Sequence, residues 1–198
     1  MYVLLGASNF VRMNKNFRLA NCRSLAVSGA TVSPLRNSPW IKGILEEYLE
    51  QQPRGIHLND TLILIGGTND IRKGVPSLTL QSDFRRLLRL CTRHFGKIVL
   101  ATIPPIPFFD GDVNERIEEL NRWLEDVSSL RPDLILVDCF TPFIDPSSGE
   151  PCIFFFEETY TRRRDERHLE PRTDLVHLNE LGLFIMKHLL LEAAGRVS

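Results

Sequence analysis

Residues able to perform acyl transfer occur near both ends of this sequence. Ser8 comes just after the apolar run at residues 2–5, whereas Asp174 and His177 stand three residues apart near the C-terminus. A serine hydroxyl becomes an effective nucleophile when an imidazole takes its proton, and a carboxylate can fix the tautomer of that imidazole. On a short turn, the three-residue spacing lets the side chains of Asp174 and His177 hydrogen-bond. The sequence therefore predicts Ser8 as the nucleophile, His177 as the base and Asp174 as the orienting carboxylate.

Acyl transfer also requires hydrogen-bond donors aimed at the oxyanion of the tetrahedral intermediate, and each donor contributes about 3 kcal/mol. Gly29 can offer its backbone N–H because no Cβ obstructs approach, and Asn69 can offer its side-chain amide. Both residues are therefore candidates for an oxyanion hole. Simpler alternatives remain for two of these positions. Ser8 could be only a helix N-cap, and Asn69 with Asp70 could simply form a turn, since these residue types favour such places.

A second carboxylate–histidine pair competes with the first. Asp165 and His168 have the same three-residue spacing as Asp174 and His177. The Asp165–His168 pair lies among arginines and is not directly followed by a helical pattern. The Asp174–His177 pair directly precedes one.

Five short apolar runs alternate with segments of helical periodicity. The runs do not alternate with polar residues, and they lie at residues 3–5, 24–27, 61–65, 98–102 and 134–137. This pattern is typical of strands buried on both faces of a parallel sheet. Helices are expected from Ser38 as N-cap with Pro39 as first residue, from about Ser82, from about Asp112, and from Asn179 to about Ala194. The alternation predicts a doubly wound α/β sheet with right-handed crossovers.

Such a sheet would gather the candidate site residues at one edge. In open α/β sheets, ligands bind outside the carboxyl ends of the strands. Ser8, Gly29 and Asn69 each fall just beyond the end of an expected strand. Residues 141–173 carry several prolines and are expected to form a long irregular connection, which in other proteins is usually functional or mobile.

Length and composition indicate one compact domain that spans residues 1–198. The hydrophobic fraction is 43% and the charged fraction 25%, and no apolar run approaches the roughly 18 residues needed to cross a bilayer. The start lacks the pattern of a secretory signal. The four cysteines are widely separated and form no CxxC pair, so neither a zinc site nor a redox motif is expected. Together these features predict an intracellular, cytoplasmic protein.

The charge distribution is uneven. The first 42 residues contain six basic residues and no acidic one, although the whole chain has a net charge of −1. An arginine cluster follows later, at Arg162, Arg163, Arg164 and Arg167. The basic 12–42 segment and the Arg162–Arg167 cluster could be solvated surfaces, or they could contact RNA or an anionic membrane. The sequence gives no indication of the oligomeric state.

The candidate residues lie in four segments that resemble the conserved blocks of the SGNH (GDSL-type) hydrolase superfamily. The segments are Gly6-Ala7-Ser8, Gly29, Gly67-Thr68-Asn69-Asp70 and Asp174-Leu175-Val176-His177, in the order of the family. The resemblance implies a three-layer α/β/α sandwich with a five-stranded parallel sheet. It also implies a serine esterase that uses no metal or cofactor, acts on a carboxylic ester of a small molecule or lipid, acetyl esters included, and adds the Ser8 backbone N–H to the oxyanion hole. Because the family places a helix directly after its histidine, the resemblance favours Asp174 and His177 over Asp165 and His168.

One position departs from the family pattern. Ala7 stands where the family usually has aspartate, so a carboxylate that supports the first block is absent. The chain is also similar to the esterase domain in the first open reading frame of some non-LTR retrotransposons. A further similar group is the SGNH-like RNA-binding domain of the germ-plasm protein Oskar, which has lost its catalytic residues. The alternative function is therefore a non-catalytic module that binds RNA or anionic membrane.

Overall fold

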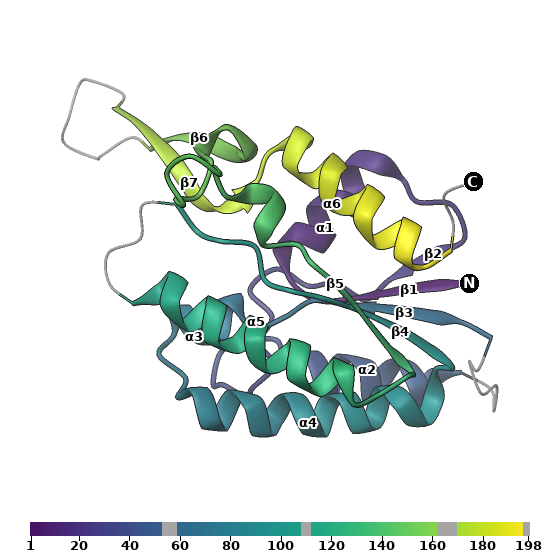
Figure 1. Ribbon diagram of the computed structural model, residues 1–198. Helices are drawn as coiled ribbons and strands as arrows, with labels where there is room; N and C mark the ends of the chain where they lie inside the picture. Colours follow the sequence, from purple (N-terminus) through teal and green to yellow (C-terminus); the bar gives the residue numbers. More distant parts are fainter. Residues whose placement is uncertain (53–58, 108–111, 162–169, 196–198) are drawn as a thin grey trace.

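The computed structural model describes residues 1–52, 59–107, 112–161 and 170–195. For residues 158–161 and 170–175, only the backbone is described. Figure 1 shows a central sheet with helices on both faces and a small two-stranded hairpin beside it. The expected three-layer α/β/α architecture is therefore confirmed.

The central sheet has five strands, and every neighbouring pair is parallel. The strands are β1 (Tyr2–Leu5), β2 (Cys22–Ser24), β3 (Thr61–Leu64), β4 (Lys97–Ala101) and β5 (Leu134–Val137). Their order is β2-β1-β3-β4-β5, so the chain winds outward in one direction from β1 and in the other from β3. Ligands of doubly wound sheets bind where the winding reverses, which here lies between the carboxyl ends of β1 and β3.

Two layers of helices bury the sheet. Because successive side chains of a strand point to opposite faces, Val3 and Leu5 enter one core cluster and Leu4 enters the other. The first cluster lies against α2 (Ile41–Gln51), α4 (Ser77–His94) and α5 (Val113–Ser129), and the second against α1 (Ser8–Phe17) and α6 (Glu180–Ala193). In the described parts of the chain, no helix has the length and apolarity needed to cross a membrane.

Two helices begin where the sequence predicts, and two begin elsewhere. Asp112 and Asn179 are the N-caps of α5 and α6, as expected, and the Asn179 side chain accepts a hydrogen bond from the Gly182 N–H. The N-cap of α2 is Trp40 instead of Ser38, because Trp40 pairs with Thr31 as an isolated bridge and the Ile41 N–H donates to the Thr31 carbonyl oxygen at 2.9 Å. The fourth helix starts at Ser77, directly after Pro76, instead of near Ser82.

The long connection before the last helix contains more regular structure than expected. It forms two short 3₁₀ helices, η1 (Thr141–Phe143) and η2 (Ile153–Phe155), and a hairpin of β6 (Phe156–Thr161) and β7 (Glu170–Leu178). The Asp174–His177 segment consequently lies in a strand and not on a short turn. Phe156 pairs with Leu178 but Glu157 pairs with Asp174, so residues 175–177 form a bulge in β7. A bulge breaks the strict alternation of side chains and redirects them.

Candidate active site

Ser8 is the first helical residue of α1, two residues beyond the glycine that ends β1. The tight strand-to-helix turn depends on Gly6, because a Cβ at that position would lie 2.6 Å from the carbonyl oxygen of Ile65. Ala7 is the N-cap and makes no side-chain capping hydrogen bond, so the alternative role of Ser8 as N-cap is wrong.

The start of α1 favours negative charge beside Ser8. The N–H groups in the first turn of a helix have no intrahelical acceptor, so the Ser8 N–H can donate to a substrate oxygen. The ten-residue helix adds the positive end of its dipole at the same place. The local structure thus suits both an alkoxide on the Ser8 hydroxyl and an oxyanion next to it.

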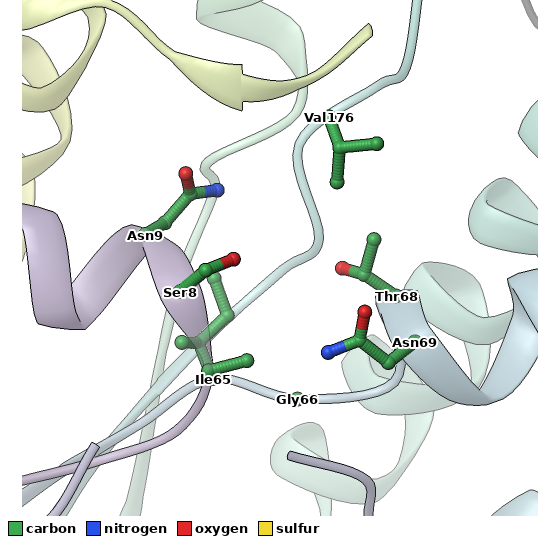
Figure 2. Close-up of a pocket in the computed structure, with 8 residues that line it drawn as sticks. Ser8, Asn9, Ile65, Gly66, Thr68, Asn69 and Val176 are labelled. Atoms are coloured by element: carbon green, nitrogen blue, oxygen red, sulfur yellow. The ribbon is translucent and has the colours of Figure 1, made fainter. Parts of the chain in front are cut away.

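Asn69 faces Ser8 across a small pocket. It belongs to α3 (Thr68–Arg72), which follows β3 through Gly67, whose φ of 109° lies in the region that glycine tolerates. The Asn69 Nδ2 atom donates to the Ala30 carbonyl oxygen at 2.9 Å. That bond uses one of the two amide protons and fixes the orientation of the side chain. Figure 2 shows the Ser8 hydroxyl and the Asn69 amide on opposite sides of the pocket.

The pocket between these two side chains is narrow, with a cavity volume of about 20 Å³. Its walls come from the turn after β1, the turn after β3 and strand β7. The lining residues are Ala7, Ser8, Asn9, Ile65, Gly66, Thr68, Asn69 and Val176. The pocket therefore sits at the reversal of winding between β1 and β3, as the sheet topology requires.

Gly29 lies near this pocket but is not one of its lining residues. Its φ is +76°, and a Cβ built there would have no neighbour within 4 Å, so the backbone is open on that side. The next residue, Ala30, supplies the carbonyl that accepts from Asn69. The segment that carries Gly29 is thus tied directly to a pocket residue.

The buried carboxylate of Asp70 fixes the position of the segment that follows Gly29. Both oxygens of Asp70 accept backbone hydrogen bonds, from the Val32 N–H at 2.9 Å and from the Ser33 N–H at 2.8 Å. Burial raises the pKa of Asp70 above its ordinary value, against the opposing effect of these hydrogen bonds. Asp70 is fully buried, so it acts as a clamp inside the fold and does not reach the pocket.

Replacing Asp70 by asparagine should lower the free energy of unfolding by roughly 1–3 kcal/mol, because the new NH₂ group leaves one buried N–H without an acceptor. Chemical denaturation of both proteins measures the change. A matched control is Asp83→Asn in α4, since the Asp83 carboxylate pairs with the exposed side chain of Arg86. That control should lose no more than about 1 kcal/mol. Equal losses of unfolding free energy in the two variants would contradict the stabilising role given to the Asp70 hydrogen bonds.

The structure does not place the expected base in the pocket wall. His177 lies in the β7 bulge and is half-buried, but its neighbour Val176 is the residue that lines the pocket. The backbone of Asp174 belongs to β7, and its side chain lies outside the described residues. The competing pair, Asp165 and His168, lies outside the described residues entirely, as does the Arg162–Arg167 cluster.

Asn9 links the nucleophile's helix to the histidine's strand. Its Oδ1 atom accepts a hydrogen bond from the Leu178 N–H at 3.3 Å, and Leu178 directly follows His177. Asn9, Thr68 and Val176 line the pocket but were not among the predicted site residues. Each of the three adjoins a predicted site residue, namely Ser8, Asn69 or His177, which was the available signal.

Comparisons with known proteins identify the family and the fold of the chain. A family model described as the GDSL-like lipase/acylhydrolase family matches residues 7–183. No curated protein matches the chain.

Solved structures share the fold at low sequence identity. A G-D-S-L family lipolytic protein from Veillonella parvula is 16% identical, with a TM-score of 0.71 over 99% of this chain and 98% of the other. A GDSL-like lipase from Bacteroides thetaiotaomicron is 18% identical, with a TM-score of 0.69 over 98% and 87%. The OSK domain of Drosophila Oskar is also 18% identical, with a TM-score of 0.70 over 96% and 86%.

Proposed function

The chain belongs to the GDSL-like lipase/acylhydrolase family, and from this membership we propose that it is a serine esterase. It hydrolyses carboxylic esters, of a small molecule or a lipid, through an acyl-enzyme intermediate on Ser8. The observation that carries the proposal is the pair formed by the Ser8 hydroxyl, at the start of α1, and the Asn69 amide across the pocket.

In the proposed reaction, His177 takes the proton of the Ser8 hydroxyl, and the oxygen attacks the ester carbonyl. The tetrahedral oxyanion accepts hydrogen bonds from the backbone N–H groups of Ser8 and Gly29 and from the free amide proton of Asn69. His177 then gives its proton to the leaving alcohol. Water attacks the acyl-enzyme with His177 again as base, and Ser8 is released.

This role requires the His177 imidazole to reach the Ser8 hydroxyl. The bulge at residues 175–177 is the place where β7 can redirect its side chains, and catalytic hydrogen bonds often tighten only when substrate is bound. Asp174, in the same strand, is the carboxylate proposed to orient the imidazole. The Asn9–Leu178 hydrogen bond keeps this end of β7 against the first turn of α1.

The proposal is tested by replacing Asn69 with alanine in a p-nitrophenyl acetate assay. Loss of one oxyanion donor should lower kcat by about 10²–10³-fold, with a much smaller change in KM, because the bond strengthens as the oxyanion forms. Because Asn69 also bonds to Ala30, thermal unfolding must show that the variant is folded at the assay temperature. A folded variant with unchanged kcat would count against the proposed oxyanion hole.

A second candidate function is a non-catalytic module that binds RNA or anionic membrane. Two observations favour it: Val176 lies in the pocket wall where a base is needed, and four basic side chains of the 12–42 segment are exposed, namely Lys15, Arg18, Arg23 and Arg36. Two other basic residues of that segment are neutralised, since Arg12 pairs with Glu157 and Lys42 with Glu46. This candidate requires salt-sensitive binding and no hydrolysis that depends on Ser8.

A further inference from the structure

We infer that Asn9 and Arg12 of α1 are positioning residues for His177, because they tie α1 to the hairpin on both sides of the β7 bulge. This inference rests on the proposed function, in which the His177 imidazole must reach the hydroxyl of Ser8, the first residue of α1. It is carried by the register of the hairpin, by the partners of the two side chains and by the burial of one of those partners.

The β7 bulge does not take its position from β6. In the register of the hairpin, residues 175–177 are not paired with β6, and His177 is the last of them. The paired residues that border the bulge are Asp174, opposite Glu157, and Leu178. An unpaired segment follows the residues at its two borders, so the place of the imidazole depends on how these borders are held.

α1 is joined to both borders. The Asn9 Oδ1 atom accepts a hydrogen bond from the Leu178 N–H at 3.3 Å, and the Arg12 guanidinium forms an ion pair with the Glu157 carboxylate. Residues three apart on a helix lie on the same face, so one face of α1 carries both links. Figure 2 shows the Asn9 side chain beside Ser8, with its oxygen pointing away from the pocket. The two links thus fix the bulge relative to the helix of the nucleophile.

The link through Asn9 is the stronger of the two, because its donor is buried. Leu178 is 0% exposed, and a buried N–H that loses its acceptor is costly. In Asn9→Ala the end of β7 should therefore move until the Leu178 N–H reaches water or another acceptor. That movement would carry His177, the preceding residue, away from the Ser8 hydroxyl.

The link through Arg12 is weaker but cleaner to test. The side chains of Arg12 and Glu157 are 31% and 32% exposed, and partly exposed ion pairs contribute little to stability. Neither residue lines the pocket, so neither can act by touching the substrate there. Removing this ion pair should change the position of the bulge and leave the chain folded.

The test measures kcat and KM for p-nitrophenyl acetate in variants of both links. Asn9→Ala should lower kcat about five- to tenfold, because one hydrogen bond can bias the position of a strand by about this factor. Arg12→Gln and Glu157→Gln should each lower kcat about two- to fivefold, and Arg12→Lys, which keeps the charge, should restore it. KM should change less than twofold throughout, because the Ser8 and Asn69 donors stay in place.

Double variants distinguish positioning from a general loss of stability. Arg12→Gln/Glu157→Gln should be no slower than either single variant, because only one link is broken. Asn9→Ala added to His177→Ala should lower the residual kcat less than twofold, because no imidazole remains to be positioned. The matched control is Asn16→Ala, which changes an exposed asparagine of α1 and should keep wild-type kcat.

The outcomes separate this inference from the proposed function. If the wild type hydrolyses the ester and folded Asn9→Ala is equally fast, the positioning role is wrong and the esterase stands. An equal loss from Asn9→Ala with and without His177 would show that Asn9 acts on the substrate itself, which also overturns the inference. Unchanged kcat in Arg12→Gln and Glu157→Gln would overturn the second link.

Two further results are decisive as well. If thermal unfolding shows that Asn9→Ala is not folded, the Arg12 and Glu157 variants decide whether α1 positions the bulge. If the wild type hydrolyses no ester, the proposed function is wrong and the positioning role falls with it.

Discussion

Replacing Ser8 with alanine is expected to lower kcat for p-nitrophenyl acetate by about 10⁴–10⁶-fold, to the residual level that binding and the oxyanion donors give alone. The substitution removes one oxygen atom and keeps the backbone N–H. Alanine is also the best helix former, so the start of α1 should be preserved. The loss should therefore appear in kcat, with a melting temperature close to that of the wild type.

Ser129→Ala is the matched control for this substitution. Ser129 is the last residue of α5, and its exposed hydroxyl bonds only the Asp126 carbonyl oxygen, at 2.8 Å. The control variant should retain wild-type kcat and KM. If Ser8→Ala hydrolysed the ester at the wild-type rate, Ser8 would not be the nucleophile.

The second large effect is expected from His177→Ala, which should lower kcat by about 10⁴–10⁶-fold, whereas His168→Ala should keep wild-type activity. Ser8 and His177 act as one unit in the proposed reaction. The double variant Ser8→Ala/His177→Ala should accordingly be no less active than either single variant. If the reduction of kcat in the double variant equalled the product of the two single reductions, the two residues would act independently.

His188→Ala controls for the general effect of removing an imidazole. His188 is exposed on α6, where its ring lies 4.3 Å from that of Phe184. The control should change kcat less than twofold. If His168→Ala abolishes activity and His177→Ala does not, the base has been assigned to the wrong pair, and Asp165 with His168 takes its place.

Four strands of the central sheet could be predicted because their signal is local, whereas the strand expected at residues 24–27 lies instead at Cys22–Ser24. The runs at β1, β3, β4 and β5 are apolar without alternation, which follows directly from burial on both faces. The position of Ser8 and Asn69 at adjacent strand ends follows from the parallel sheet, whose strand order places β1 beside β3. The proximity of Ser8 and Asn69 could therefore be predicted from the sequence.

The features that could not be predicted depend on contacts between distant residues. The start of α2 is displaced from Ser38-Pro39 by the pairing of Thr31 with Trp40. Likewise, β7 pairs with β6 in a register that leaves residues 175–177 as a bulge, and Val176 in that bulge lines the pocket beside Ser8. A three-residue spacing between Asp174 and His177 carries no information about that register, so the turn expected from the spacing is wrong.

The role of Asp70 shows the same limitation on a smaller scale. In sequence it adjoins Asn69 and is typical of a turn or a cap. In the fold its carboxylate binds the N–H groups of Val32 and Ser33, nearly forty positions earlier, and so supports the segment that carries Gly29. Residue type indicated a hydrogen-bonding carboxylate, but only the packing of β3 beside β1 determines its partners.

Ser8 as an activated nucleophile is the central claim, and covalent labelling by a fluorophosphonate tests it most directly. Such a reagent reacts with an activated serine hydroxyl, and mass spectrometry of a digest identifies the modified residue. One adduct is expected, on the peptide that contains Ser8; it should be lost in Ser8→Ala and kept in Ser129→Ala. An unlabelled Ser8 in the folded wild-type chain, or an adduct that persists in Ser8→Ala, would contradict this claim and favour the non-catalytic binding module or a different nucleophile.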